Sequence, residues 1–245
     1  MTINRKTLAL IAGLLAACVA QAAETDTIET AAGPLAITPI VHGSVQLAFG
    51  GLVIQVDPWS RGDYAAAPKA DLILITDVHG DHLDAAMIEQ LSGAETRIVV
   101  PAAVAEELGK GTVLANGESL EVNGMGIEAV PMYNLVRGPE EGKLFHDKGR
   151  GNGYILTMGG KRVYLAGDTE CTPEMKALEG IDIAFVPMNL PYTMPPDEAA
   201  ACVAAFEPAI VYPYHYRGSD LEVFTTALAG VPGVEVRLRE WYPGD

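Results

Sequence analysis

The chain has 245 residues, of which 49% are hydrophobic, so it can bury a sizeable core, and one domain is the expected organisation. Its formal net charge of −16 argues against nucleic acid or an anionic membrane as a partner. A small anionic substrate stays open, because a bound metal ion would reverse the sign of the local potential.

The first 22 residues have the pattern of an export signal. Two basic residues precede an apolar stretch, Leu8 to Ala17, that is too short to span a bilayer, and Ala20 to Ala22 fits a signal peptidase site. A second interpretation is a lipoprotein, because the Leu-Ala-Ala-Cys run ending at Cys18 resembles a lipobox. With either signal the protein is predicted to be periplasmic or secreted. Residues 23–245 then form a single domain in which we expect no transmembrane segment.

Two cysteines remain after cleavage behind Ala22. Cys171 lies beside a polar turn, close enough in sequence to a candidate ligand for metal contact to be considered. Cys202 lies in an alanine-rich helix and is interpreted as buried apolar packing. A disulfide between them is open, but nothing in their spacing predicts one.

Strands and helices alternate in the first half of the chain. Apolar alternation between glycine turns predicts short strands over residues 35–57, and a continuous apolar run predicts a fully buried strand over 71–76. We then expect a helix over 84–91 with Asp84 as its N-cap, a strand over 98–100 and a helix over 101–108.

The second half repeats this order. Asn123-Gly124 and Gly159-Gly160 predict two hairpins, with strands over 120–122, 127–130, 154–158 and 162–166. Helices over 174–178, 196–206 and 221–229 alternate with strands over 181–187, 210–214 and 234–239. Two such halves predict two sheets packed face to face with helices outside, and the polar segment 137–152 is expected to be a loop.

The stretch Asp77-Val78-His79-Gly80-Asp81-His82 carries four potential metal ligands in six residues. It directly follows the buried strand, so a loop at a strand end would present several ligands to one point. Imidazole and carboxylate together suit zinc, iron or manganese. The motif therefore predicts a metal site.

Two further ligand-type residues follow buried strands. Asp168 lies in a Gly-Asp-Thr turn, and His215 comes directly after the strand over 210–214. Alone, Asp168 is as readily a turn-capping aspartate, and His215 a core histidine. Together with the motif they predict a shared site, in which Asp168 could bridge two cations.

These motifs resemble the metallo-β-lactamase superfamily over nearly the whole mature chain. The family's loop reads His-x-His-x-Asp-His and is followed by a lone His, a bridging Asp in a Gly-Asp-Thr-like turn and a final His. Runs such as Phe145-His146-Asp147-Lys148-Gly149 and Ala166-Gly167-Asp168-Thr169 are similar to a bacterial subgroup of hydrolases. The resemblance implies an α/β fold of the four-layer αββα sandwich type.

The chain departs from the family pattern at two ligand positions. The first His of the motif is Asp77, and no His stands at the expected middle position near Pro131 to Asn134. Asn134 could coordinate through its amide oxygen, or His146 could enter the site as a ligand or substrate contact.

Carried over position by position, the resemblance implies two metal positions. Asp77 and His79 would hold the first ion, and Asp81, His82 and His215 the second, with Asp168 bridging them.

Other residues are candidates for supporting roles. His42 follows an apolar strand and could approach the site, or it could be a core histidine. Asp57 could orient a ligating imidazole, or it could cap a turn. Tyr192, Tyr214 and Tyr216 are expected near the mouth of the site, either to stabilise an oxyanion or as ordinary packing.

The predicted function is metal-dependent hydrolysis with one or two divalent ions. Zinc is the expected metal, with manganese or iron as alternatives, because a third carboxylate makes the site harder. The substrate would be a small molecule or lipid with an ester, lactone, amide or phosphodiester bond, and Asp81 would orient the nucleophile and transfer a proton. Two other classes are a non-catalytic metal-binding protein with a degenerate site and a di-iron redox enzyme. The departures from the motif argue against β-lactam hydrolysis.

Overall fold

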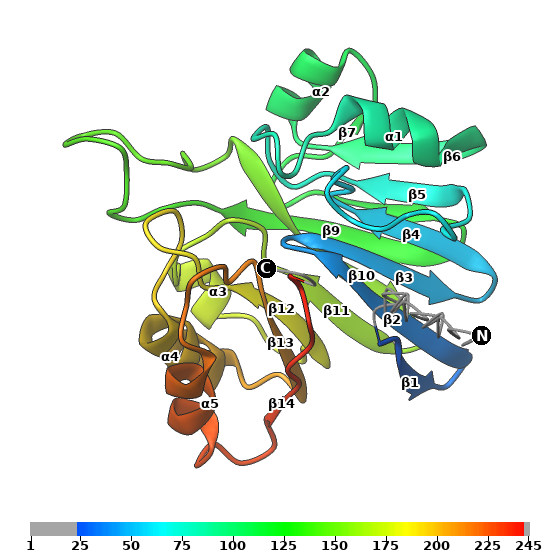
Figure 1. The fold of residues 1–245 in the computed structure, drawn as a ribbon. Coiled ribbons are helices and arrows are strands. Elements are labelled where there is room, and N and C mark those ends of the chain that lie inside the picture. Colours follow the sequence, from blue (N-terminus) through cyan, green and yellow to red (C-terminus); the bar gives the residue numbers. More distant parts are fainter. Residues whose placement is uncertain (1–23, 243–245) are drawn as a thin grey trace, which may run out of the picture.

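Each half of the described chain, residues 24–242, builds one seven-stranded sheet in the computed structural model (Figure 1). The predicted export signal lies outside the described residues. The first sheet contains β1 (Asp26–Thr30), β2 (Gly33–Val41), β3 (Ser44–Phe49), β4 (Leu52–Val56), β5 (Ala70–Leu74), β6 (Ser92–Val100) and β7 (Thr112–Val113). The second contains β8 (Ser119–Val122), β9 (Met125–Met132), β10 (Gly151–Met158), β11 (Lys161–Leu165), β12 (Ile183–Pro187), β13 (Ile210–Tyr214) and β14 (Glu235–Val236).

Both sheets follow the same pairing pattern along the chain. The first three strand pairings in each are antiparallel, and the last three are parallel. Helices cover the parallel strands because parallel connections need crossovers. They are α1 (Ala85–Leu91), α2 (Ala102–Leu108), α3 (Pro173–Lys176), α4 (Pro196–Phe206) and α5 (Leu221–Leu228).

The four layers follow from the alternation of side chains along the buried strands. Leu72 and Leu74 pack into the core between the two sheets, whereas Ile73 and Ile75 pack under α1 and α2. On the other side, a third core joins the second sheet to α3, α4 and α5. Because successive side chains of this segment are buried alternately in two different cores, its sequence is one continuous apolar run. The predicted αββα sandwich is confirmed.

Local signals account for most element boundaries. Asp84 caps α1, since its side chain accepts a hydrogen bond from the Met87 backbone N–H. Asn123 and Gly124 have φ of 52° and 79°, as a tight hairpin turn requires. The helix over 196–206 and the strand over 210–214 have the predicted bounds. No helix between residues 24 and 242 is both long and apolar enough to cross a bilayer.

The sequence predicts neither β1 nor β7. In β1 a single apolar residue, Ile28, stands among polar ones, and the strand lies at the edge of its sheet. Its position is set by pairing with β2 and by contacts with distant residues of the second half of the chain. The Tyr212 hydroxyl donates to Asp26 Oδ2 over 2.6 Å, and the Arg239 guanidinium also pairs with the Asp26 carboxylate.

Replacing Asp26 with Asn is expected to lower the free energy of unfolding by about 1–2 kcal/mol at pH 7, because hydrogen bonds to a charged group are stronger than neutral ones. Burial acts to raise the pKa of Asp26, but the bonds from Arg239 and Tyr212 outweigh it and the pKa is lowered. The charged form is therefore stabilised by folding, and this stability is lost as the pH falls through the folded pKa. Urea denaturation of both proteins should show a difference that narrows below about pH 4. A difference independent of pH would contradict the assignment.

Candidate metal centre

The predicted ligand residues meet at one edge of the two sheets, where parallel strands end. The loop from Asp77 to His82 follows β5, Asp168 follows β11, and His215 follows β13. The carboxyl ends of parallel strands are where α/β folds bind ligands, because the loops there converge. Residues that are more than 130 positions apart in the sequence are thus brought into contact.

One group of ligand atoms, the second cluster, consists of Asp81, His82, Asp168 and His215. His82 Nε2 lies 3.3 Å from Asp168 Oδ2, and His215 Nε2 lies 3.3 Å from Asp168 Oδ1. Asp81 Oδ2 is 3.4 Å from His215 Nε2 and 3.8 Å from His82 Nε2. All four side chains face the same small volume.

The other group, the first cluster, consists of Asp77, His79 and His146. His79 Nδ1 lies 2.7 Å from Asp77 Oδ2, and His146 Nε2 lies 3.8 Å from the same oxygen. His146 Nε2 is also 3.4 Å from Asp168 Oδ2. Asp168 therefore contacts both clusters, which is the position that a bridging carboxylate needs.

Of the two alternatives for the missing middle histidine, the structure brings His146 into the cluster and places Asn134 behind it. Both the backbone N–H and Nδ1 of His146 lie within hydrogen-bond distance of Asn134 Oδ1, at 2.8 and 2.6 Å. Asn134 is held in turn, since its Nδ2 donates to Glu170 Oε1 over 3.0 Å. With Nδ1 bound to an amide oxygen, His146 Nε2 keeps its lone pair for the cluster.

Buried atoms without partners show that the two clusters fit metal ions. Among the described residues, Nε2 of His82, His146 and His215 and Oδ1 of Asp168 are buried without a hydrogen-bond partner. Buried polar atoms are normally satisfied, so four such atoms around one volume need an explanation. Ligands held at about 2.0–2.2 Å from a tetrahedral ion lie about 3.3–3.6 Å from one another. The observed spacing of 3.3–3.4 Å to Asp168 matches that arrangement.

Asp57 supports the His82 ring from behind the second cluster. Asp57 Oδ2 lies 2.8 Å from His82 Nδ1, which directs the imidazole lone pair of Nε2 toward the cluster. Thr76 donates to the same carboxylate from its backbone and its hydroxyl. Burial acts to raise the pKa of Asp168, but the nearby His215 and His82 hold it well below its ordinary range. Its carboxylate is therefore ionised and ready to coordinate.

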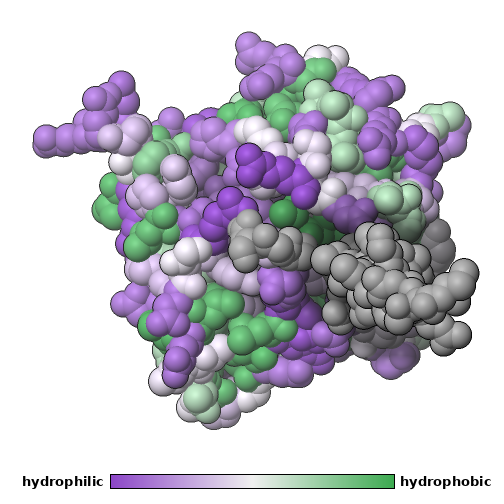
Figure 2. Space-filling model, viewed as in Figure 1, coloured by the Kyte–Doolittle hydropathy of each residue, from purple (hydrophilic) through white to green (hydrophobic). Residues whose placement is uncertain are grey.

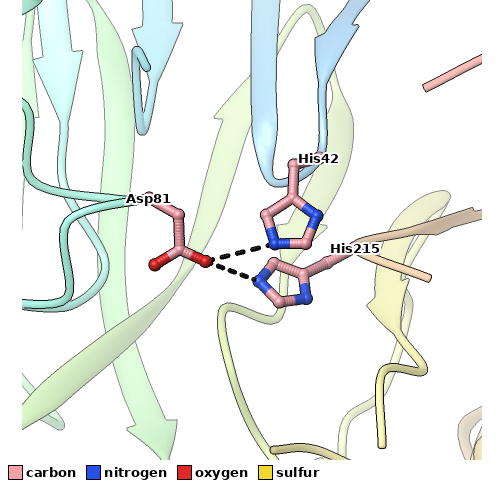
Figure 3. Close-up of side chains that lie close together, drawn as sticks. All are labelled: His42, Asp81 and His215. Atoms are coloured by element: carbon pink, nitrogen blue, oxygen red, sulfur yellow. Dashed lines mark hydrogen bonds and ion pairs between the residues drawn. The ribbon is translucent and has the colours of Figure 1, made fainter. Parts of the chain in front are cut away.

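His42 contacts the second cluster directly (Figure 3). Its Nε2 lies 3.1 Å from Asp81 Oδ2, and its ring is tilted by 33° against the His215 ring with centroids 3.6 Å apart. His42 Nδ1 is 2.6 Å from the Tyr242 hydroxyl. Burial lowers the pKa of His42 to about 4, so the imidazole is neutral at pH 7. His42 thus holds Asp81 in place.

Strained backbone orients three of these side chains, two toward the site and Asp57 toward the His82 ring behind it. His42, Asp57 and His215 have φ of 54°, 44° and 46°, a region that residues other than glycine rarely adopt. They are three of the five non-glycine residues with positive φ in the described chain. Each directly follows the last residue of a strand, so the left-handed conformation turns the side chain away from the strand direction.

Asp77, at the first motif position, is paired with an arginine that sequence reasoning missed. Arg150 Nε and Nη2 donate to the two Asp77 oxygens over 3.1 and 3.0 Å. The pair is bidentate, and Asp77 is fully buried. Because Arg150 neutralises the third carboxylate, the cluster carries less net negative charge than the motif alone implies. In the sequence, only the position of Arg150 directly before β10 hinted at its pairing with Asp77.

The loop after Asp168 is held by a disulfide between Cys171 and Cys202 of α4. Cys202 is buried in the apolar core as expected, and it also forms the disulfide that the sequence left open, so Cys171 is not available for metal contact. The two residues are 31 positions apart, and their proximity results from the packing of α4 against the second sheet, which the spacing does not reveal. Glu170 in this loop accepts from the Arg137 backbone N–H over 2.7 Å, so the loop is tied on both sides.

The three tyrosines differ in position. The Tyr214 hydroxyl accepts a bond from the Gly167 N–H, and the Tyr216 hydroxyl donates to the Arg239 carbonyl, so both have structural partners. Tyr192 is exposed beside the first cluster, where the Asn134 side chain donates to its backbone oxygen over 2.8 Å.

Comparison with known proteins shows the family and the fold. A family model described as a β-lactamase superfamily domain matches residues 36–215. A UPF0173 metal-dependent hydrolase from Thermococcus onnurineus is 37% identical over 190 residues, which cover 71% of this chain and 81% of that relative. The structure of a candidate metal-dependent hydrolase from Parabacteroides distasonis has a TM-score of 0.85 and 46% identity, covering 90% of this chain and 100% of that one. Igni18, a metallo hydrolase from Ignicoccus hospitalis, has a TM-score of 0.71 and 26% identity, covering 86% of this chain and 96% of its own.

A double-mutant cycle tests the pairing at the first cluster. Replacing Arg150 with Gln should destabilise the chelator-treated protein by about 3 kcal/mol, because it leaves the buried Asp77 carboxylate without its cation. Adding Asp77→Asn should restore most of that loss, which urea denaturation would measure. Replacing Arg162, which pairs with Glu128 at the surface, should cost less than about 1 kcal/mol. Strictly additive effects of the Arg150 and Asp77 substitutions would contradict the pairing.

Proposed function

Because this chain belongs to the metallo-β-lactamase superfamily, we propose that it is a hydrolase that uses one or two divalent metal ions bound by the first and second clusters. The observation that carries the proposal is the set of buried ligand atoms without partners, three imidazole nitrogens and one carboxylate oxygen, that face one volume. A protein that did not bind cations there would leave these atoms unsatisfied.

The residues divide into two positions that share one carboxylate. Asp77, His79 and His146 would hold the first ion, and Asp81, His82 and His215 the second, with Asp168 between them. When bound, the ions would supply a hydroxide at neutral pH by lowering the pKa of water, and would polarise the oxygen that gains charge.

Asp81 is the residue we assign to proton transfer. It is the most accessible carboxylate of the second cluster, with 29% of its side chain exposed against 5% for Asp168. The hydrogen bond to His42 holds one oxygen inward, so the carboxylate can orient an attacking water and carry its proton to the leaving group. Asp57 and Asn134 keep the His82 and His146 rings in the required tautomer.

The bond that is cleaved is proposed to be an ester, lactone, amide or phosphodiester of a small molecule or lipid. Zinc is the proposed metal because each cluster supplies two imidazole donors, with manganese or iron as alternatives favoured by the number of carboxylates. A non-catalytic metal-binding protein is the second candidate, and the Asp77–Arg150 pair at the first cluster is the observation that favours it.

We also propose that the protein acts outside the cytoplasm, in the periplasm or as a secreted or lipid-anchored protein. The signal-like pattern of residues 1–22 supports this, with Cys18 as the anchor in the lipoprotein form. The Cys171–Cys202 disulfide supports it independently, because structural disulfides persist mainly in oxidising compartments.

The metal content of the protein tests the proposed ligands. Elemental mass spectrometry of the mature protein should find up to two ions per chain, and Asp168→Asn should lose most of them because it removes the shared carboxylate. One ion per chain would indicate that the first cluster does not bind metal in solution. No metal after reconstitution would contradict the hydrolase.

The rate of hydrolysis tests the role of Asp81. Asp81→Ala should reduce hydrolysis of a responsive ester, lactone or phosphodiester by about 10²- to 10⁴-fold, the usual contribution of a general acid or base. Its circular dichroism spectrum should be unchanged. Asp147, an exposed aspartate of the loop before β10, provides the matched control, and Asp147→Ala should keep full activity. A turnover rate of the Asp81→Ala variant equal to that of the wild type would contradict the assignment of Asp81 to proton transfer.

A further inference from the structure

Exposed apolar side chains gather beside the first cluster. In the described chain the exposed large hydrophobic residues are Val113, Leu135, Val136, Leu190, Tyr192, Val223 and Leu238. Four of these seven lie on two neighbouring loops, between β9 and β10 and between β12 and α4. We call Leu135, Val136, Leu190 and Tyr192 the apolar rim. Val136 is the most exposed of the seven, at 76%.

The first of these loops is fixed to a ligand histidine. Leu135 and Val136 directly follow Asn134, whose side-chain oxygen is bonded to His146. Backbone N–H groups of Val136 and Arg137 both reach the buried Glu170 carboxylate, at 3.4 and 2.7 Å. The two apolar side chains are thus held outward close to the first cluster.

The second loop runs from the second cluster to the first. Asn189 lies at its start, with its amide nitrogen 3.5 Å from His215 Nδ1, and the N–H groups of Tyr192 and Thr193 close a turn on the Asn189 carbonyl. At its far end Asn134 donates to the Tyr192 carbonyl over 2.8 Å. The loop that carries Leu190 and Tyr192 is therefore attached through Asn189 to His215 of the second cluster. Through Asn134 it is attached to His146 of the first cluster.

The figures show the two loops meeting. The segment between β9 and β10 projects from the sheets beside the segment between β12 and α4 (Figure 1), and the Phe145 and Tyr192 rings pack 5.0 Å apart. Hydrophobic areas lie at the left edge of the face in Figure 2, among several on that face. Exposed apolar side chains gathered beside a polar site are typical of ligand-binding surfaces.

The charges around the rim do not favour an anionic occupant. Arg137 is paired with Glu170 and Glu198, and Lys148 is paired with Glu174, so these nearby cations are neutralised within the protein. Glu170 is itself buried. The surface next to the first cluster is therefore apolar without an excess of positive charge.

We propose that the apolar rim binds an uncharged hydrocarbon arm of the substrate, so that the hydrolase selects substrates in which the scissile group carries an alkyl or aryl chain. The inference rests on the proposed function, because the arm is placed relative to a reacting group at the two clusters. Continuity with the clusters favours this occupant. Four side chains are too few for a stable interface with a second copy, which buries about 1,200–2,000 Å² in total.

Binding of alkyl hydroxamates to the metal-loaded protein tests the rim without requiring turnover. The hydroxamate head chelates metal, and the alkyl chain is the variable arm. Calorimetry from acetohydroxamate to octanohydroxamate should show affinity rising about twofold for each added methylene, since full burial is worth roughly fourfold and the rim is half open. The complete series adds six methylenes and should span roughly 60-fold on the same basis.

Two variants locate the arm. Val136→Ser combined with Tyr192→Ser should reduce the ratio of octanohydroxamate to acetohydroxamate affinity to a few-fold. Val113→Ser is the matched control, since Val113 is also an exposed valine but lies on β7 in the first sheet, and it should keep the full ratio.

The outcomes separate the rim from the proposed function. Acetohydroxamate binding with no gain along the series would overturn the rim and leave the metal centre standing. Binding of no hydroxamate to protein with measured metal would overturn both. A chain-length gain that persists in the double variant would place the arm elsewhere. A dimer that the double variant converts to monomer in sedimentation would assign the rim to a second copy.

Discussion

The site depends on holding several ligand-type nitrogen and oxygen atoms close together in a buried volume. Three imidazole nitrogens lie 3.3–3.4 Å from the oxygens of Asp168 in a buried volume, where each would otherwise require a hydrogen-bond partner. The surrounding structure makes this arrangement tolerable. Asp57 and Asn134 bind the far nitrogens of His82 and His146, so the near nitrogens are directed inward. A cation is the missing partner that satisfies all of them at once.

Charge is balanced locally although the whole chain is strongly acidic. The buried Asp77 carboxylate faces Arg150, and the buried Glu170 carboxylate faces Arg137. These pairs leave Asp81 and Asp168 as the carboxylates that a cation would have to neutralise. The acidic composition therefore says little about the site itself, where what matters is which carboxylates already have a partner.

Much of the fold follows from the sequence because the signals are local. Apolar runs, a capping aspartate and Asn-Gly or Gly-Gly turns predict most strands and helices, and the motif from Asp77 to His82 predicts a metal site. The remainder depends on contacts between distant segments. The place of His146 depends on a bond to Asn134 across a long loop, and the partner of Asp77 lies 73 residues away. Neither relation leaves a pattern in the linear sequence.

The backbone conformation at the site could not be predicted from the sequence either. His42 and His215 have positive φ, which is uncommon for any residue other than glycine, so the sequence does not single out these positions. The strain is tolerated because the strands before both residues are well packed, and it turns their rings toward Asp81. A disulfide between cysteines 31 positions apart escaped prediction for the same reason, because only the packing of α4 brings them together.

The two halves of the chain share one pairing pattern, and each contributes ligands to both clusters. His79 and His82 come from the first sheet's loops, whereas His146, Asp168 and His215 come from the second's. Neither half can hold an ion at full coordination by itself. Metal uptake must therefore come late in folding, after the sheets have docked, and the rate at which a refolding chain captures metal reports on the docking step rather than on the formation of either sheet.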